Sequence, residues 1–203
     1  SYPKGGRVLH MLRKELGDGP FWAALRHYAL THEYGVVETA DLRTAIEASS
    51  GRGLNWFFDQ WIYHGGHPEF EVEYRWDADE NLVRMTVKQT QEVTELTPLF
   101  RVPVEIALVT PDETIVREIT ISKPEETFSF SLPLRPERVV FDPQDWILKK
   151  LTFLKSKQEW INQLAHDQHI IPRVRAAEAL GEFKPDADAR DALIAAASSD
   201  SFW

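Results

Sequence analysis

The chain contains no cysteine among its 203 residues. Disulfide bonds and thiolate zinc sites are therefore excluded, and the location is left open between the cytoplasm and the periplasm. No apolar run approaches the roughly 18 residues that a membrane-spanning helix needs, so we expect no membrane partner. Lys and Arg number 23 against 32 Asp and Glu, which gives a net charge of -9. Because phosphate binding requires clustered positive charge, we expect no nucleic-acid partner.

Apolar residues make up 43% of the chain and include 7 Trp and 11 Phe, enough for a packed core. The spacing of these residues changes twice along the chain. It predicts a multidomain α+β protein with a helical region at 1–66, a β-region at 67–145 and a second helical region at 146–203.

Helical spacing marks the first region. Pro3 suits the first turn of a helix, and Val8, Leu12 and Leu16 then recur on one face. Four helices are expected, separated by glycine-containing turns. The last runs from Leu54 to Ile62 and is apolar nearly all round, so we expect it to be buried.

Strand-like alternation begins directly after His67-Pro68, where Phe70, Val72, Tyr74 and Trp76 alternate with charged residues. Five further short strands are expected around apolar residues at 83–87, 102–108, 115–121, 128–132 and 139–141. Six short strands with turn residues between them predict an antiparallel β-sandwich.

From about Trp146 the sequence predicts a return to helix. A pair of helices at 173–181 and 189–197 resembles a HEAT-type repeat, with Asp167 and Asp200 spaced 33 positions apart around it. A single repeat cannot bury its own apolar face, so we expect further repeats after Phe202-Trp203 and a protein partner at this helical tail.

Tyr2 is the candidate catalytic residue. A phenolic O–H can donate a hydrogen bond to the oxyanion of peptide hydrolysis, and such a donor contributes roughly 3 to 4 kcal/mol. Because Tyr2 precedes Pro3, we expect an extended backbone that places its phenol just before the positive end of a helix. Gly5 and Gly6 would allow close packing there. The alternative is an unstructured second residue beside flexible glycines, and the residues alone leave both interpretations open.

The run Tyr2-Pro3-Lys4-Gly5-Gly6, followed by an apolar helix, resembles the YxKG segment of the aminopeptidase N family of zinc metallopeptidases, the gluzincin group that includes leukotriene hydrolases. The resemblance extends over about residues 2 to 155. Further matching stretches come in the family's order: Phe21-Trp22 through Tyr28, Thr39-Ala40-Asp41-Leu42, Phe57 to Ile62 with Gly66-His67-Pro68, Gln89-Thr90-Gln91 and Phe141-Asp142-Pro143.

The resemblance implies the helical end of a thermolysin-like catalytic domain, then a β-sandwich, then the start of a HEAT- or armadillo-like superhelix. It implies a zinc aminopeptidase that removes N-terminal residues from peptides, with Tyr2 stabilising the oxyanion. The family's HExxH zinc site lies before this tyrosine. We therefore expect a truncated chain that binds no zinc and is inactive alone.

Two alternatives remain open. The family includes members that lost zinc and serve as docking scaffolds, although the retained Tyr2 and Lys4-Gly5 favour an enzyme. The other is a free-standing protein-binding sandwich.

Other candidate sites are weaker. His32-Glu33 begins like HExxH but has Val36 where the second His is required. The other candidates have simpler structural interpretations: His64 and His67 in a turn, His166 and His169 facing solvent, Glu69, Glu71 and Glu73 on a solvated strand face, and Arg173 and Arg175 on the surface or in repeat packing rather than in a substrate cavity.

Overall fold

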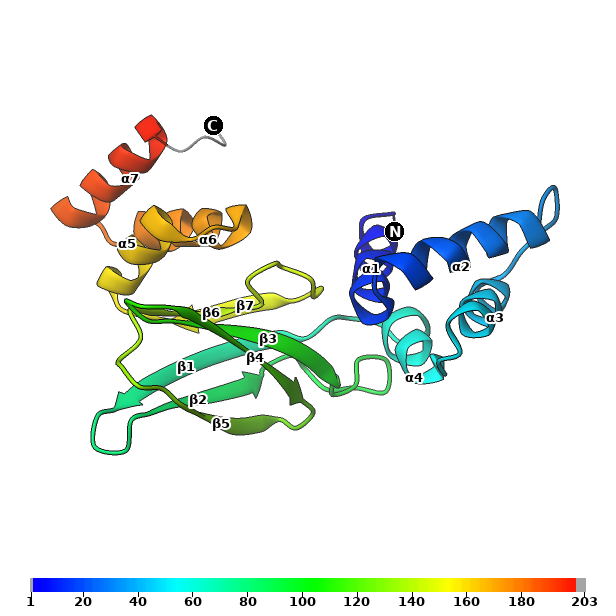
Figure 1. The fold of residues 1–203 in the computed structure, drawn as a ribbon, viewed down its shortest axis with the longest axis horizontal. Helices are drawn as coiled ribbons and strands as arrows, with labels where there is room; N and C mark the ends of the chain where they lie inside the picture. Colours follow the sequence, from blue (N-terminus) through cyan, green and yellow to red (C-terminus); the bar gives the residue numbers. More distant parts are fainter. Residues whose placement is uncertain (1, 200–203) are drawn as a thin grey trace. The chain divides into compact units, whose positions relative to one another are not determined.

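The computed structural model describes residues 2–199, which form two compact units (Figure 1). Unit 1 comprises residues 1–67, 91–98 and 146–148. Unit 2 comprises residues 68–90, 99–145 and 149–203. Each unit is therefore assembled from segments that are separate in the sequence.

Unit 1 contains the four predicted helical segments. They are α1 (Tyr2–Leu16), α2 (Asp18–Thr31), α3 (Thr39–Ser50) and α4 (Asn55–Phe58), the last continuing as the π-helix η1 (Asp59–Tyr63). Buried side chains of α1 and α2, among them Leu12 and Phe21, contribute to its core. Leu54, Phe58 and Trp61 are also buried.

The expectation that the fourth helix is buried on every side is wrong at its end. Ile62 and Tyr63 are 38% and 55% exposed. The helix changes there to π geometry, whose extra residue per turn shifts the side chains that follow. Two neighbours in the sequence therefore reach solvent.

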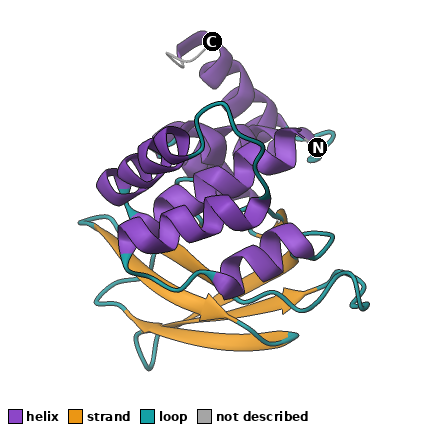
Figure 2. Ribbon diagram, turned by 90° about the vertical axis from the view of Figure 1, so that its right-hand side faces the viewer, coloured by secondary structure: helices purple, strands orange, loops and turns teal. Residues whose placement is uncertain are grey.

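Unit 2 holds two sheets (Figures 1 and 2). One has four strands in the order β5-β2-β1-β7, and the other has three in the order β4-β3-β6. The strands are β1 (Glu69–Asp77), β2 (Leu82–Gln89), β3 (Val102–Val109), β4 (Thr114–Ile121), β5 (Glu125–Ser131), β6 (Arg138–Phe141) and β7 (Lys150–Leu154).

The alternation in β1 gives the predicted result in the first half of the strand. Phe70 and Val72 are buried, whereas the glutamates at 69, 71 and 73 are partly or fully exposed. Tyr74 and Trp76, expected on the same buried face, are only half-buried. The ring of Phe70 lies 5.5 Å from the ring of Phe141 in β6, so the buried faces of the two sheets meet there. Apolar side chains from both sheets thus form one core.

The seventh strand corrects two predictions. We expected helix from about Trp146 and an all-antiparallel arrangement, but Lys150–Leu154 forms β7 and pairs parallel to β1. Only Phe153 of β7 is buried, so the strand lacks the alternation that reveals β1. Its edge position explains this, because one side of the strand remains open.

Three helices follow β7: α5 (Lys157–His166), α6 (Ile170–Gly181) and α7 (Ala187–Ser199). The two helices predicted at 173–181 and 189–197 are therefore present. Asp200, Phe202 and Trp203, on which part of the repeat prediction depends, lie outside the described residues, as does Ser1. Within residues 2–199, every helix is too short or too polar to span a bilayer.

A buried ionic cluster joins the β6–β7 loop to α6. The ammonium of Lys149 contacts the carboxylates of Asp142 and Asp145, and Arg175 of α6 also reaches Asp145, at 2.5 Å. The side chains of Lys149 and Asp142 are 0% and 1% exposed. Both aspartates have left-handed backbones, with φ of 50° and 54°, which Asp tolerates better than most residues.

Candidate functional site

Tyr2 is the first residue of α1 and is 98% exposed. The expected extended conformation before Pro3 is therefore not observed, because the helix already includes Tyr2. Tyr2 lies at the positive end of the helix dipole, a position that suits interaction with a negatively charged oxygen.

Two contacts from the segment at residues 146–148 fix α1. The ring of His10 stacks on Trp146 with centroids 4.3 Å apart. The backbone N–H of Leu148 donates to the sulfur of Met11 at 3.4 Å. Together with its buried face, these contacts hold the helix that carries Tyr2. No pattern in the sequence predicts this contact, which joins residues 137 positions apart.

Gly5 and Gly6, which follow in the same turn, were expected to permit close packing. A Cβ built on either glycine meets no atom of the described chain within 4 Å. Each glycine costs a helix about 1 kcal/mol relative to alanine. The described residues therefore give no packing reason for this cost, and the surface over both glycines is open.

The described residues do not form a zinc-binding site. Residues 2–199 contain no group of three or more His, Cys, Asp or Glu side chains placed to hold a metal. His32 instead ends α2, and His64 lies beside Asp59, with its Nδ1 2.9 Å from the backbone oxygen of that residue. His166 and His169 are both exposed.

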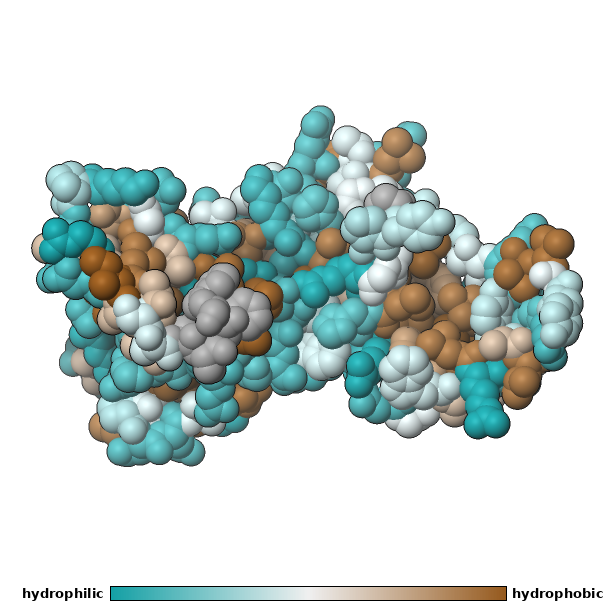
Figure 3. Space-filling model, turned by 90° about the horizontal axis from the view of Figure 1, so that it is seen from above, coloured by the Kyte–Doolittle hydropathy of each residue, from teal (hydrophilic) through white to brown (hydrophobic). Residues whose placement is uncertain are grey.

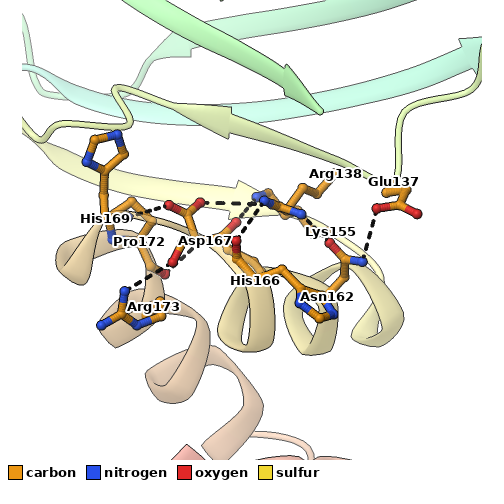
Figure 4. A network of polar contacts seen from close by, with 10 residues as sticks. Glu137, Arg138, Lys155, Asn162, His166, Asp167, His169, Pro172 and Arg173 are labelled. Carbon is orange, nitrogen blue, oxygen red and sulfur yellow. Dashed lines mark hydrogen bonds and ion pairs between the residues drawn. The ribbon is translucent and has the colours of Figure 1, made fainter. Parts of the chain in front are cut away.

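A polar network anchors α5 and α6 to the sheet (Figure 4). Arg138 of β6 donates to the side chain of Asn162 at 2.5 Å and to the carbonyl of His166 at 3.3 Å, and its Nε lies 3.9 Å from Asp167. Arg173 donates to the carbonyl of Asp167 at 3.0 Å. Arg173 and Arg175 thus serve in packing contacts, as their simpler interpretation predicts.

The ammonium of Lys155 lies inside this region. It sits 4.4 Å from the ring centre of Phe153 and 4.5 Å from that of Trp160, and it donates to the side chain of Gln163. Burial lowers the pKa of Lys155 to about 7. The Asp167 carboxylate opposes this shift, whereas Arg138 and Arg175 strengthen it.

Replacing Lys155 by Met is expected to flatten the pH dependence of stability. Between the folded pKa of about 7 and the unfolded value of 10.5, the unfolded chain binds more protons. The stability that depends on this group therefore rises with pH across that window, by about 2 kcal/mol from pH 7 to pH 9. Urea unfolding of the Lys155→Met variant and of the unmodified protein at several pH values gives, for each, the slope of the unfolding free energy against pH. The control is Lys150→Met at an exposed lysine, which should keep the slope of the unmodified protein. Equal slopes for Lys155→Met and the unmodified protein would show that the lowered pKa of Lys155 does not cause the pH dependence.

Unit 1 also presents apolar residues to solvent. On the face seen from above in Figure 3, apolar residues gather in a hollow over its helices. Large exposed apolar residues of this unit include Leu9, Trp22, Leu30, Tyr34 and Val36. Contiguous exposed apolar surface commonly marks a place where another surface packs.

The chain is similar in sequence to several known peptidases and a peptidase-associated protein. Residues 1–61 match the Peptidase family M1 domain. Tricorn protease-interacting factor F2 of Thermoplasma volcanium is 35% identical over 89 residues, which are 44% of this chain and 11% of that protein. Aminopeptidase N of Lactococcus lactis is 38% identical over 72 residues, which are 36% of this chain and 8% of the enzyme.

A solved structure extends the similarity to nearly the whole chain. Aminopeptidase A of Legionella pneumophila, in complex with aspartic acid, superposes with a TM-score of 0.75 at 19% identity. The match covers 98% of this chain and 24% of that one. This chain is therefore similar to M1 aminopeptidases in fold, and its residues 1–61 match a part of their peptidase domain.

Proposed function

We propose that this chain is part of a zinc-dependent aminopeptidase that removes N-terminal residues from peptides. Residues 1–66 would close its catalytic domain, 67–145 would form a β-sandwich and 146–203 would begin a HEAT-like helical domain. The observation that carries the proposal is Tyr2, whose phenol is 98% exposed at the start of the segment that matches the M1 domain.

Tyr2 has the chemistry for one defined task. Attack on a peptide carbonyl places negative charge on its oxygen, and the phenolic O–H of Tyr2 donates a hydrogen bond to that oxygen. The interaction is stronger in the transition state than with the neutral carbonyl, so it accelerates the reaction rather than only binding substrate.

The proposed reaction also needs a zinc ion and a general base, which we place in other parts of the protein. A bound zinc ion supplies Lewis-acid chemistry and an activated water in peptidases of this kind. Since the described residues do not fit a zinc site, we propose that the ligands and the general base belong to other parts of the protein. The open surface over Gly5 and Gly6 and the exposed apolar residues of unit 1 support a further catalytic-domain segment packing there.

The isolated chain is expected to show no aminopeptidase activity, because a hydrogen-bond donor without metal or base cannot activate water. The measurement is release of p-nitroaniline from aminoacyl-p-nitroanilides, with and without added zinc, for the isolated chain and for the complete protein. Zinc-dependent hydrolysis by the isolated chain would contradict the assignment of the metal site to other residues.

A non-catalytic scaffold is the second candidate. One relative is named an interacting factor of a protease, and α6 and α7 of this chain expose Ile170, Ile171 and Ile194. Such a helical surface suits a protein partner. The same assay decides between the two functions: a complete protein that binds no zinc and hydrolyses no aminoacyl substrate is a scaffold, and Tyr2 then has no catalytic role.

A further inference from the structure

The first turn of α1 contains residues that disfavour a helix. Its residues include two glycines, each less favourable in a helix than alanine. Lys4 adds a positive charge where the helix dipole is also positive, and the first turn contains no acidic residue. Local preferences that conflict with the fold in this way are typical of functional positions.

Lys4 connects this turn to a second element of unit 1. Its ammonium donates to the carbonyl of His64 at 3.4 Å and to that of Gly66 at 3.3 Å. Both distances are at the long end for hydrogen bonds, so attraction between the charge and two carbonyl dipoles contributes to the contact. His64 directly follows η1, where the helix dipole is negative and a cation is favoured.

The turn that accepts Lys4 packs closely against the segment at residues 91–98. Gly66 has a left-handed backbone with φ of 69°, and a Cβ built there would lie 2.6 Å from a methyl carbon of Thr97. Only glycine fits such a position without displacing its neighbour. The N–H of Gly65 donates to the carbonyl of Leu96 at 2.7 Å. The two carbonyls are therefore held by the segment at residues 91–98.

We propose that Lys4 is a positioning residue that sets the place of the Tyr2 phenol by tying the first turn of α1 to the His64–Gly66 turn. The inference rests on the proposed function of Tyr2. Lys4 lies two positions after Tyr2 in the same helical turn, so releasing its ammonium leaves that weak turn without this tether. A misplacement of about 1 Å in a catalytic group can cost on the order of 100-fold in rate.

The test is a double-mutant cycle in the complete protein. Lys4→Met is expected to lower kcat by about 10- to 100-fold. KM and zinc content should be nearly unchanged, and Lys4→Arg, which keeps the charge and donors, should retain more activity. In the Tyr2→Phe background, Lys4→Met should have little further effect because Lys4 acts through the phenol. Lys150→Met, which removes an exposed lysine outside unit 1, is the control and should retain kcat.

The outcomes separate the two hypotheses. If Tyr2→Phe lowers kcat while Lys4→Met leaves it unchanged, the tether is refuted and the proposed role of Tyr2 stands. An equal loss from Lys4→Met in both backgrounds, or a rise in KM alone, shows that Lys4 acts independently of Tyr2 and also refutes the tether. If Tyr2→Phe has no effect, or the complete protein is inactive, the proposed function itself fails and this inference falls with it.

Discussion

Tyr2→Phe in the complete protein is expected to lower kcat for aminoacyl substrates by about 100- to 1,000-fold, the usual cost of removing one oxyanion donor. The ring of Phe fills the same space, so the loss reports the O–H alone. KM should change little, because the hydrogen bond strengthens only as charge develops on the carbonyl oxygen. Steady-state kinetics with parallel measurement of zinc content provide the test.

The control for this variant is Tyr34→Phe. Tyr34 is 100% exposed in the loop between α2 and α3 of the same unit, so removing its hydroxyl should leave kcat unchanged. A Tyr2→Phe protein that keeps its zinc and retains kcat within about threefold would rule out the oxyanion role, since the smallest expected loss is about 100-fold.

Lys149→Met is expected to destabilise unit 2 by about 3 to 5 kcal/mol, the range found when one member of a buried ion pair is removed. Arg175 continues to compensate Asp145, but Asp142 loses its contact with the ammonium in a site where its side chain is 1% exposed. Urea unfolding followed by tryptophan fluorescence measures the loss at neutral pH.

The adjacent lysine is the matched control. Lys150 is 66% exposed and pairs with Glu69 at 2.9 Å on the surface. Lys150→Met should therefore cost less than about 1 kcal/mol. Similar losses for both variants would show that the buried cluster contributes no more than a surface pair.

The sequence predicted those helices and strands in which the spacing of apolar residues matches the spacing of the buried positions. The alternation from Phe70 to Trp76 identified β1, and helical spacing identified α1, α6 and α7. β7 was missed for a physical reason: only Phe153 among its five residues is buried, so no period-2 pattern appears. Trp146 and Ile147 looked like the start of a helix, but Trp146 lies in a loop segment and stacks on α1.

The candidate site was only partly predictable. The motif around Tyr2 pointed to the phenol, and the structure shows that phenol exposed. The contacts of Lys4 and His10 could not be predicted, because they join residues about 60 to 140 positions apart and depend on how the chain turns between them. Lys4 is the only charged residue between Tyr2 and the glycines of the motif. This position was the one sequence feature that could have singled it out.

The parallel pairing of β7 with β1 also imposes an order on folding during synthesis. Glu69 pairs with Lys150, 81 positions later. At about 5 to 20 residues per second, the ribosome takes roughly 4 to 16 s to deliver the partner of β1. The first helix of unit 1 is completed after a longer delay, because Trp146, which stacks on it, follows His10 by 136 positions. The last segment of unit 1 (residues 146–148) and the parallel partner of β1 therefore emerge within a few residues of one another, and the helices α5 to α7 of unit 2 follow only afterwards. Because of this order, α1 emerges long before its final contacts exist.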